Sequence, residues 1–241
     1  MTDPPVLFNS QPRIERIDFS DGQFCLLVDE ALREPEQLRD YAVARREHFR
    51  HAGFNAYPGI ELPVPPQASA ALEEFFRRHV RDLLDARRNV RMNSRLAMVT
   101  VPGAQLQARQ WLCHRDSAWI DPRHCIAASV LYLFDDPSLG GTSFYAPKLA
   151  PPAIDVLIHD SSTASNEEFA RKYQLAPGYM AESNAYFERI GRVEPKWNRM
   201  IFYDGRTFHS GEVGSPRALS GDPMRGRLTL NGFFTCTRKA I

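Results

Sequence analysis

Two residues near the middle of the chain, His114 and Asp116, have the types and the spacing that can hold a metal ion. They end the segment QARQWLCHRD, which begins as a strand-like run. Side chains at positions i and i+2 of a strand point to the same face, roughly 7 Å apart along the backbone, so the imidazole and the carboxylate can converge on one ion. A second imidazole would complete a 2-His-1-carboxylate face, which leaves coordination positions open for reactants. The candidate for that imidazole is His209.

The elements that must position these residues fall into two parts. In residues 1–94 we expect a short strand, a helix that begins at Pro35, an extended connector over 57–66 and a second helix over 68–88, ready to pack against a sheet. From residue 95 the period changes to short runs rich in β-branched and aromatic residues, which predict an antiparallel sheet. The expected strands lie in RLAMVTV, QARQWLCH, CIAASVLYLF, GTSFYAP, RMIFYDGRTFHSGEV and RGRLTLNGFFTCTR.

A polar segment over residues 150–197 interrupts this sheet, and we expect it to be helical in SNEEFARKY and MAESNAYFERI. No repeat or linker divides the chain, so we expect one domain over 1–241. Its scaffold would be residues 1–94, and its sheet of about eight strands, over 95–241, would close or fold over itself to bury its edges.

Composition and charge exclude several classes of function. Lys and Arg number 30 and Asp and Glu number 29, for a net charge of +1, and the two signs are interspersed. We therefore expect neither nucleic acid nor a membrane as a partner. No apolar run approaches the roughly 18 residues of a membrane helix, so we expect a soluble cytoplasmic protein. The four cysteines are irregularly spaced and are expected to be reduced thiols. The sequence does not indicate the oligomeric state.

The order of the motifs resembles that of the 2-oxoglutarate and iron(II)-dependent oxygenases, in particular their prolyl-hydroxylase-like members. HRD (114–116) is similar to the HxD ligand pair of that superfamily, and SVLYLFDDPSLGGTSFY to the following strand and glycine loop. His209 matches the distal ligand, and RGRLTLNGFF matches the C-terminal strand. More narrowly, VDEALREPEQLRDYAVAR and YPG in the first part, with GGTSFY and RLTLNGFF, resemble a family of uncharacterised oxygenase-like proteins.

This resemblance implies an α+β fold that is mainly β. The fold would be a double-stranded β-helix (a jelly roll or cupin-like barrel) with N-terminal helices packed on one sheet. It also implies that His114, Asp116 and His209 bind Fe(II) and are the catalytic centre, with 2-oxoglutarate and O₂ as cosubstrates. His124 is kept as a reserve ligand.

By the same resemblance Arg227 pairs with the distal carboxylate of 2-oxoglutarate, a role suited to the planar guanidinium. Thr229 lies on the same face two residues on, and Tyr132 is where related hydroxylases place a tyrosine that reaches that carboxylate. The spacing from His209 to Arg227 is longer than is usual, because GSPRALSGDPM intervenes. Arg225 therefore stays open as the alternative, although the glycine before Arg227 fits the family pattern better.

The implied activity is hydroxylation of a small molecule, an amino acid or a peptidyl side chain, with desaturation also open. Related halogenases have a small residue in place of Asp116, so the carboxylate here argues against halogenation. HRD also opens the protein-kinase catalytic loop, but SAWIDP follows it, without the magnesium-binding asparagine and without an earlier glycine-rich loop. Two alternatives remain: a non-catalytic metal-binding jelly-roll protein, and a metal-dependent oxygenase that does not use 2-oxoglutarate. Residues 150–197 and 117–125 are expected to wall the substrate site.

Overall fold

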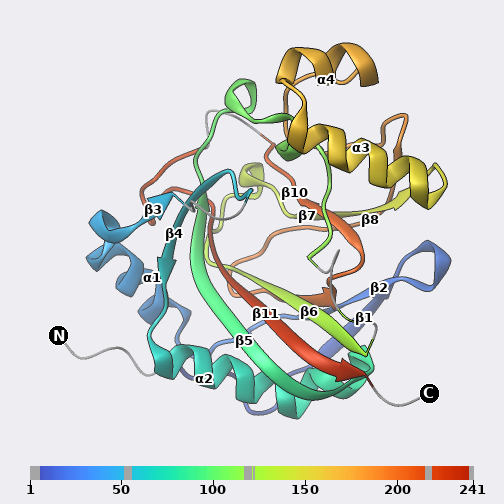
Figure 1. Cartoon of the computed structure of the whole chain (residues 1–241). Helices are drawn as coiled ribbons and strands as arrows, with labels where there is room; N and C mark the ends of the chain where they lie inside the picture. Colours follow the sequence, from blue (N-terminus) through green and yellow to red (C-terminus); the bar gives the residue numbers. More distant parts are fainter. Residues whose placement is uncertain (1–5, 52–55, 117–120, 122, 215–218, 239–241) are drawn as a thin grey trace.

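Two antiparallel sheets make up most of a computed structural model of the chain, which describes residues 6–51, 56–116, 121, 123–214 and 219–238 (Figure 1). The larger sheet has the order β1-β2-β9-β6-β11-β5-β4-β3, and the smaller has the order β10-β7-β8. Between them the described residues form no closed barrel. The strands are β1 (Ile14–Asp18), β2 (Phe24–Val28), β3 (Arg50–His51), β4 (Gly59–Pro63), β5 (Ala86–Val99), β6 (His124–Tyr132), β7 (Thr142–Pro147), β8 (Phe187–Val193), β9 (Met200–Asp204), β10 (Phe208–Gly211) and β11 (Leu228–Arg238).

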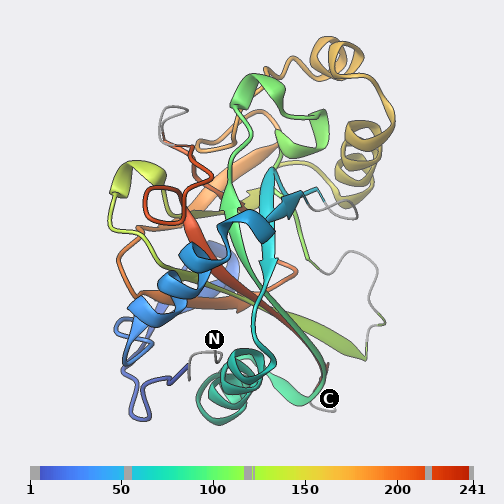
Figure 2. The same ribbon diagram turned by 90° about the vertical axis from the view of Figure 1, so that its left-hand side faces the viewer.

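Helices pack on the outside of this arrangement, and α1, α2 and α3 each have proline in the first turn, where its missing N–H costs no hydrogen bond. The helices are α1 (Pro35–Ala44), α2 (Pro66–Phe75), α3 (Pro151–Thr163) and α4 (Asn166–Tyr173). In both Figure 1 and Figure 2, α3 and α4 stand at the opposite end of the molecule from α2. No described helix combines the length and apolar character that a membrane span requires.

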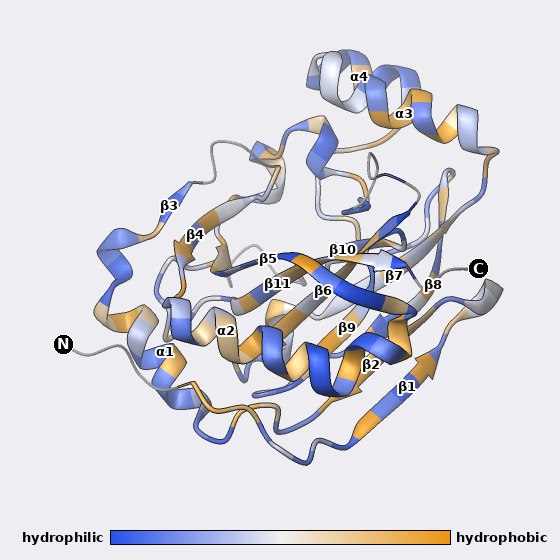
Figure 3. Ribbon diagram, turned by 60° about the horizontal axis from the view of Figure 1, so that its bottom comes forward, coloured by the Kyte–Doolittle hydropathy of each residue, from blue (hydrophilic) through white to orange (hydrophobic). Residues whose placement is uncertain are grey.

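Side chains along the strands of the large sheet point alternately to its two faces. One face, the outer one, packs into the hydrophobic core under the helices, and the other, the inner one, faces the small sheet. On the outer face, Leu230 and Phe234 of β11 join Leu72 and Phe76 in one buried cluster, and the rings of Phe76 and Phe234 stack at 4.0 Å. Each such phenyl ring removed from water stabilises the fold by about 1.5–3 kcal/mol. The intervening residues of β11 face the small sheet. Figure 3 shows that the first half of β5 is mostly hydrophilic, whereas the central strands carry the apolar residues.

The expected helix over 68–88 is wrong at its C-terminal end. The α-helix ends at Phe75, a π-helical turn follows over Phe76–Val80 and a 3-10 turn over Arg81–Leu84, and β5 begins at Ala86. Asp85 has a φ of 55°, a left-handed conformation that turns the chain. From Ala86 onward, the long antiparallel pairing of β5 with β11 overrides the helical pattern.

Two further expected elements are also wrong. QARQWLCH contains the 3-10 turn Ala108–Gln110, which follows another at Gly103–Gln105, and it pairs as a strand only at His114. MAESNAYFERI is not helical, because its last residues form β8, which pairs with β7. The connector over 57–66 contains β4, whose partners are the edge strand β3 and β5.

Candidate metal centre

Backbone pairing brings the two histidines together. His114 and His209 form an isolated antiparallel bridge, in which each N–H donates to the other's carbonyl at 2.9 Å. A second backbone hydrogen bond positions the carboxylate, because the N–H of Asp116 donates to the carbonyl of Gly205 at 2.8 Å. One nitrogen or oxygen atom from each of the three side chains lies within 4.8 Å of the others. Within the described ranges, no other cluster of three His, Cys, Asp or Glu side chains has this proximity.

The tautomer of His209 suits metal binding. Its Nδ1 lies 3.0 Å from the carbonyl oxygen of Thr207, and because a carbonyl can only accept, Nδ1 carries the proton. Nε2 is then unprotonated, with a lone pair free for a metal ion, and lies 3.5 Å from Oδ2 of Asp116. The ring of Tyr203 packs edge-on against the imidazole at 4.6 Å and fixes its plane. A hydrogen bond of this kind on the far nitrogen commonly orients a metal-ligating histidine.

The other two side chains also fit a cation. Desolvation by the surrounding protein, followed by repulsion from His209, holds the pKa of His114 below its usual value and keeps the ring neutral, against the attraction of Asp116. The side chain of His114 is nevertheless 59% exposed, because it lines a pocket through which it can be reached. Oδ2 of Asp116 is buried and makes no hydrogen bond within the described part of the chain. A buried carboxylate oxygen without a donor is costly unless a cation pairs with it.

The three residues line a cavity of about 380 Å³, within the roughly 300–1,000 Å³ that ligand sites usually occupy. Arg227 lines the same cavity although its residue is only 4% exposed. Its Nε and Nη2 donate to the carbonyl oxygens of Gly140 and Gly141 at 3.1 and 2.8 Å. Among the described residues, no carboxylate lies within 4.0 Å of this guanidinium, and Nη1 has no hydrogen-bond partner. The cavity therefore contains a buried positive charge without a counterion.

A glycine leaves the guanidinium accessible. Gly211 is two residues from His209 on β10, and a Cβ at this position would lie 3.5 Å from Nη2 of Arg227. A longer side chain would occupy the space beside the arginine. Because Gly211 has no side chain, this part of the cavity between the three metal-ligand residues and the guanidinium of Arg227 stays open.

The remaining residues expected at the site are placed as follows. Thr229 is buried, with its hydroxyl 3.4 Å from the carbonyl of Ala97. Tyr132 is fully buried, its hydroxyl pairs with Thr142 at 2.7 Å, and its ring centroid lies 5.9 Å from the guanidinium carbon of Arg227.

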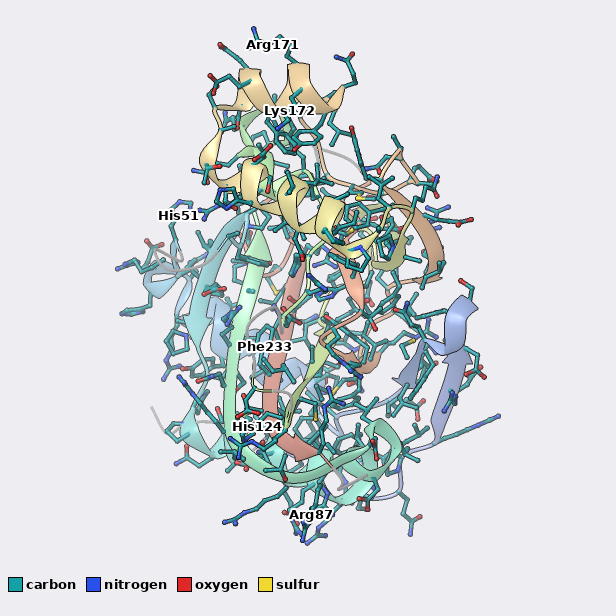
Figure 4. All side chains as sticks on the ribbon, turned by 45° about the vertical axis from the view of Figure 1, so that its right-hand side comes forward. His51, Arg87, His124, Arg171, Lys172 and Phe233 are labelled. Atoms are coloured by element: carbon teal, nitrogen blue, oxygen red, sulfur yellow. The ribbon has the colours of Figure 1, made fainter. Side chains whose placement is uncertain are left out.

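The two reserve residues lie elsewhere. Arg225 is exposed and lines a different cavity beside Arg39 and Trp197. His124, labelled in Figure 4, begins β6 opposite Thr237 of β11 and lies outside the cluster of three. Of the expected wall 117–125, residues 117–120 and 122 lie outside the described residues.

The cavity-lining residues that sequence reasoning missed include Tyr203, Asn231 and Arg95. Strand alternation could have found Asn231, because it lies in β11 an even number of residues, four, after Arg227, which directly precedes that strand. Arg95 stands opposite Asn231 in the register of β5 and β11, which only the pairing of the strands reveals.

A family of unknown function, DUF6445, has a model that matches residues 10–234. No curated protein that was searched matches the chain. Solved structures of similar outline include EvdO2 from Micromonospora carbonacea var. aurantiaca, at 11% identity over 96% of each chain and a TM-score of 0.46. HygX from Streptomyces hygroscopicus, with nickel and 2-oxoglutarate bound, has 12% identity over 89% of this chain and 82% of its own, with a TM-score of 0.47.

Proposed function

The chain belongs to the DUF6445 family, and from its own residues we propose that it is an Fe(II)- and 2-oxoglutarate-dependent oxygenase. The observation that carries the proposal is one cavity with two kinds of ligand group. It contains two imidazoles and a carboxylate gathered around one point, and a buried guanidinium that has no counterion among the described residues. A 2-His-1-carboxylate set is typical of non-haem iron enzymes, and a lone buried arginine calls for an anionic ligand.

The residues present fit the iron. His114 and His209 would each offer a neutral nitrogen, and Asp116 would offer the anionic oxygen that now lacks a hydrogen bond. Three protein ligands would leave the remaining positions to the cosubstrate and to O₂. When bound, the iron and 2-oxoglutarate supply the oxidising chemistry, in which O₂ is consumed and a substrate carbon loses hydrogen.

Arg227 fits the far carboxylate of a dicarboxylate cosubstrate. Two of its nitrogens are anchored on the glycine loop, and this fixes the plane of the guanidinium while Nη1 stays available. A fixed guanidinium binds a carboxylate with little loss of rotamer entropy. The ring of Tyr132 lies beside this arginine, but neither Tyr132 nor Thr229 is among the residues that line the cavity. We propose that the two residues support its cosubstrate end from beneath the lining, with the hydroxyl of Tyr132 paired with that of Thr142, which does line the cavity.

The order of the strands supports a jelly roll as the fold of this site. Along the chain, β5 lies in the large sheet, the bridge at His114 joins the small sheet, β6 is large, β7 and β8 are small, β9 is large, β10 is small and β11 is large. Strands that return alternately to two facing sheets form Greek keys, as a double-stranded β-helix requires. We propose that the whole chain acts as one oxygenase unit of this type.

Asp116 favours hydroxylation or desaturation, because the carboxylate occupies the position that a halide would need on the metal. We propose a small molecule, an amino acid or a peptidyl side chain as the substrate class, in keeping with the modest volume of the cavity.

Anaerobic binding tests this proposal. Protein loaded with Fe(II) should develop a weak visible charge-transfer band when 2-oxoglutarate is added. Separate replacements of His114, Asp116 and His209 by alanine should each remove stoichiometric iron while circular dichroism shows an intact fold. Stoichiometric iron in any of these variants would remove that residue from the ligand set. Bound iron without a band in the wild type would leave a metal protein that does not use 2-oxoglutarate.

A further inference from the structure

A second end of the cavity lies further along β11. Arg227 directly precedes β11, the inner face of this strand carries Thr229, Asn231 and Phe233 in alternation, and Figure 4 shows Phe233 midway along the strand. Asn231 is four residues from Arg227, which separates their backbones by about 13 Å. It pairs in register with Arg95 of β5 on one side and Val130 of β6 on the other, and side chains of all three line the cavity.

The charge at this end is already balanced. Nε of Arg95 lies 2.6 Å from a carboxylate oxygen of Glu61, and both side chains are largely buried. The guanidinium carbon also lies 4.6 Å from the ring centroid of Phe233. Arg95 is therefore neutralised and held in place, unlike Arg227. Because Arg95 already has a carboxylate partner, this end of the cavity suits a neutral group of a ligand and not an anionic one.

Asn231 has unused hydrogen-bonding capacity. The residue is 9% exposed, and its Oδ1 is buried with no hydrogen-bond partner in the described part of the chain. Exchanging the oxygen and nitrogen of the amide would leave an N–H at the same place, so the need for a partner does not depend on that assignment. Leaving such a group unpaired costs about 1–3 kcal/mol, and a ligand that pairs with it recovers this free energy.

We propose that Asn231 binds a carboxamide or peptide group of the substrate. The N–H of a carboxamide or peptide group can donate to the buried Oδ1 of Asn231, the atom that lacks a partner among the described residues. Val130 and Phe233 supply an apolar surface for the flat group beside them. This inference rests on the proposed function, because only an enzyme has a substrate. It narrows the candidate substrates to amides, including peptidyl amides.

A pair of probes that differ in one donor tests the inference without turnover. N-methylbenzamide and methyl benzoate have nearly the same shape, but the ester lacks the N–H. Their dissociation constants for the full-length protein are measured by ligand-observed NMR, in the presence of Zn(II) and 2-oxoglutarate. We expect the amide to bind about tenfold more tightly than the ester.

Variants place this preference on one side chain. In Asn231→Ala, and in Asn231→Leu, whose side chain has a similar shape to asparagine, the affinities for the amide and the ester should become about equal. Asn93→Ala, which removes an exposed asparagine from the neighbouring β5, should keep the wild-type ratio. Equal binding of the two probes by the wild type, failure of the amide to bind, or a preference that survives in Asn231→Leu would each overturn the inference. Iron and 2-oxoglutarate binding are measured separately on the wild type, so failure of the proposed function is distinguished from failure of the amide site.

Discussion

Replacing Arg227 by methionine removes the buried charge while keeping a side chain of similar length, and its effect on 2-oxoglutarate binding can be worked from the surroundings. In the wild type the far carboxylate would meet a guanidinium that has no other counterion among the described residues. In the variant that carboxylate would be buried without a partner, at a cost of about 3–5 kcal/mol. At 1.4 kcal/mol for each factor of ten, we expect the affinity for 2-oxoglutarate to fall by about 100- to 4,000-fold.

Lysine separates the charge from the geometry. Arg227→Lys keeps a cation, but a single ammonium cannot bond both glycine carbonyls and also present a fixed donor to the ligand. Loss of one charge-assisted hydrogen bond predicts a weakening of about 10- to 150-fold, less than for methionine. Both substitutions also leave glycine-loop carbonyls without their donor, and we expect the free energy of unfolding to fall by about 1–3 kcal/mol.

The assay is an anaerobic titration of the Fe(II)-loaded variants with 2-oxoglutarate, followed by the charge-transfer band, with urea unfolding to confirm that each protein is folded. Arg225→Met is the matched control, because it makes the same replacement two residues away in a different cavity. It should change the affinity by less than about twofold, as is usual for surface substitutions. An affinity within threefold of wild type for Arg227→Met, or an equal loss in the Arg225 variant, would refute the assignment of the cosubstrate to Arg227.

Three further predictions concern the scaffold. Gly140→Ala should unfold the protein or cost several kcal/mol in urea denaturation, because φ is 75° and the new Cβ would lie 1.8 Å from the carbonyl oxygen of Glu212; a stable variant would contradict this. Asp29 has its pKa lowered to about 2, mainly by its hydrogen bond with Arg199. Its stabilisation is present above the unfolded pKa of 3.8 and is lost as the pH falls through about 2, so Asp29→Asn should cost about 1 kcal/mol at pH 7, discounted for exposure, and nothing well below pH 2. All four cysteines are free and buried, so a thiol reagent should label none of them promptly in the native protein and four after unfolding.

Strands whose pattern reflects their own burial were predictable from the sequence. CIAASVLYLF and GTSFYAP became β6 and β7, and SNEEFARKY became α4, which begins at the capping box formed by Ser165 and Glu168. The helix over 68–88 was overextended because arginines and leucines after Phe75 favour a helix locally, while pairing with β11 starts at Ala86. Such pairing joins residues more than 100 positions apart, and no local pattern contains it.

The residues of the candidate metal site could be predicted from the sequence, but the structure positions them differently from what the sequence argument assumed. The sequence argument placed His114 and Asp116 on a continuous strand, but the preceding residues form 3-10 turns. Asp116 is positioned by its N–H bond to Gly205, in the turn between β9 and β10, and not by strand periodicity. Asn231 and Arg95 escaped prediction because neither forms part of the HxD motif or of the segment around His209. Their importance comes from register and from an unpaired amide, which are properties of the folded chain.

The single bridge between His114 and His209 joins the fold and the candidate site in one feature. A hydrogen-bonded antiparallel pair holds the two Cα atoms about 5.5 Å apart, so the backbone alone brings the imidazoles near each other, and their ring centroids lie 4.3 Å apart. The carbonyl of Thr207 then selects the tautomer of His209, and the carbonyl of Gly205 anchors Asp116. Because backbone groups do this positioning, the three ligands are gathered before any cation binds. Removing one ligand side chain should therefore abolish metal binding while leaving the positions of the other two largely unchanged.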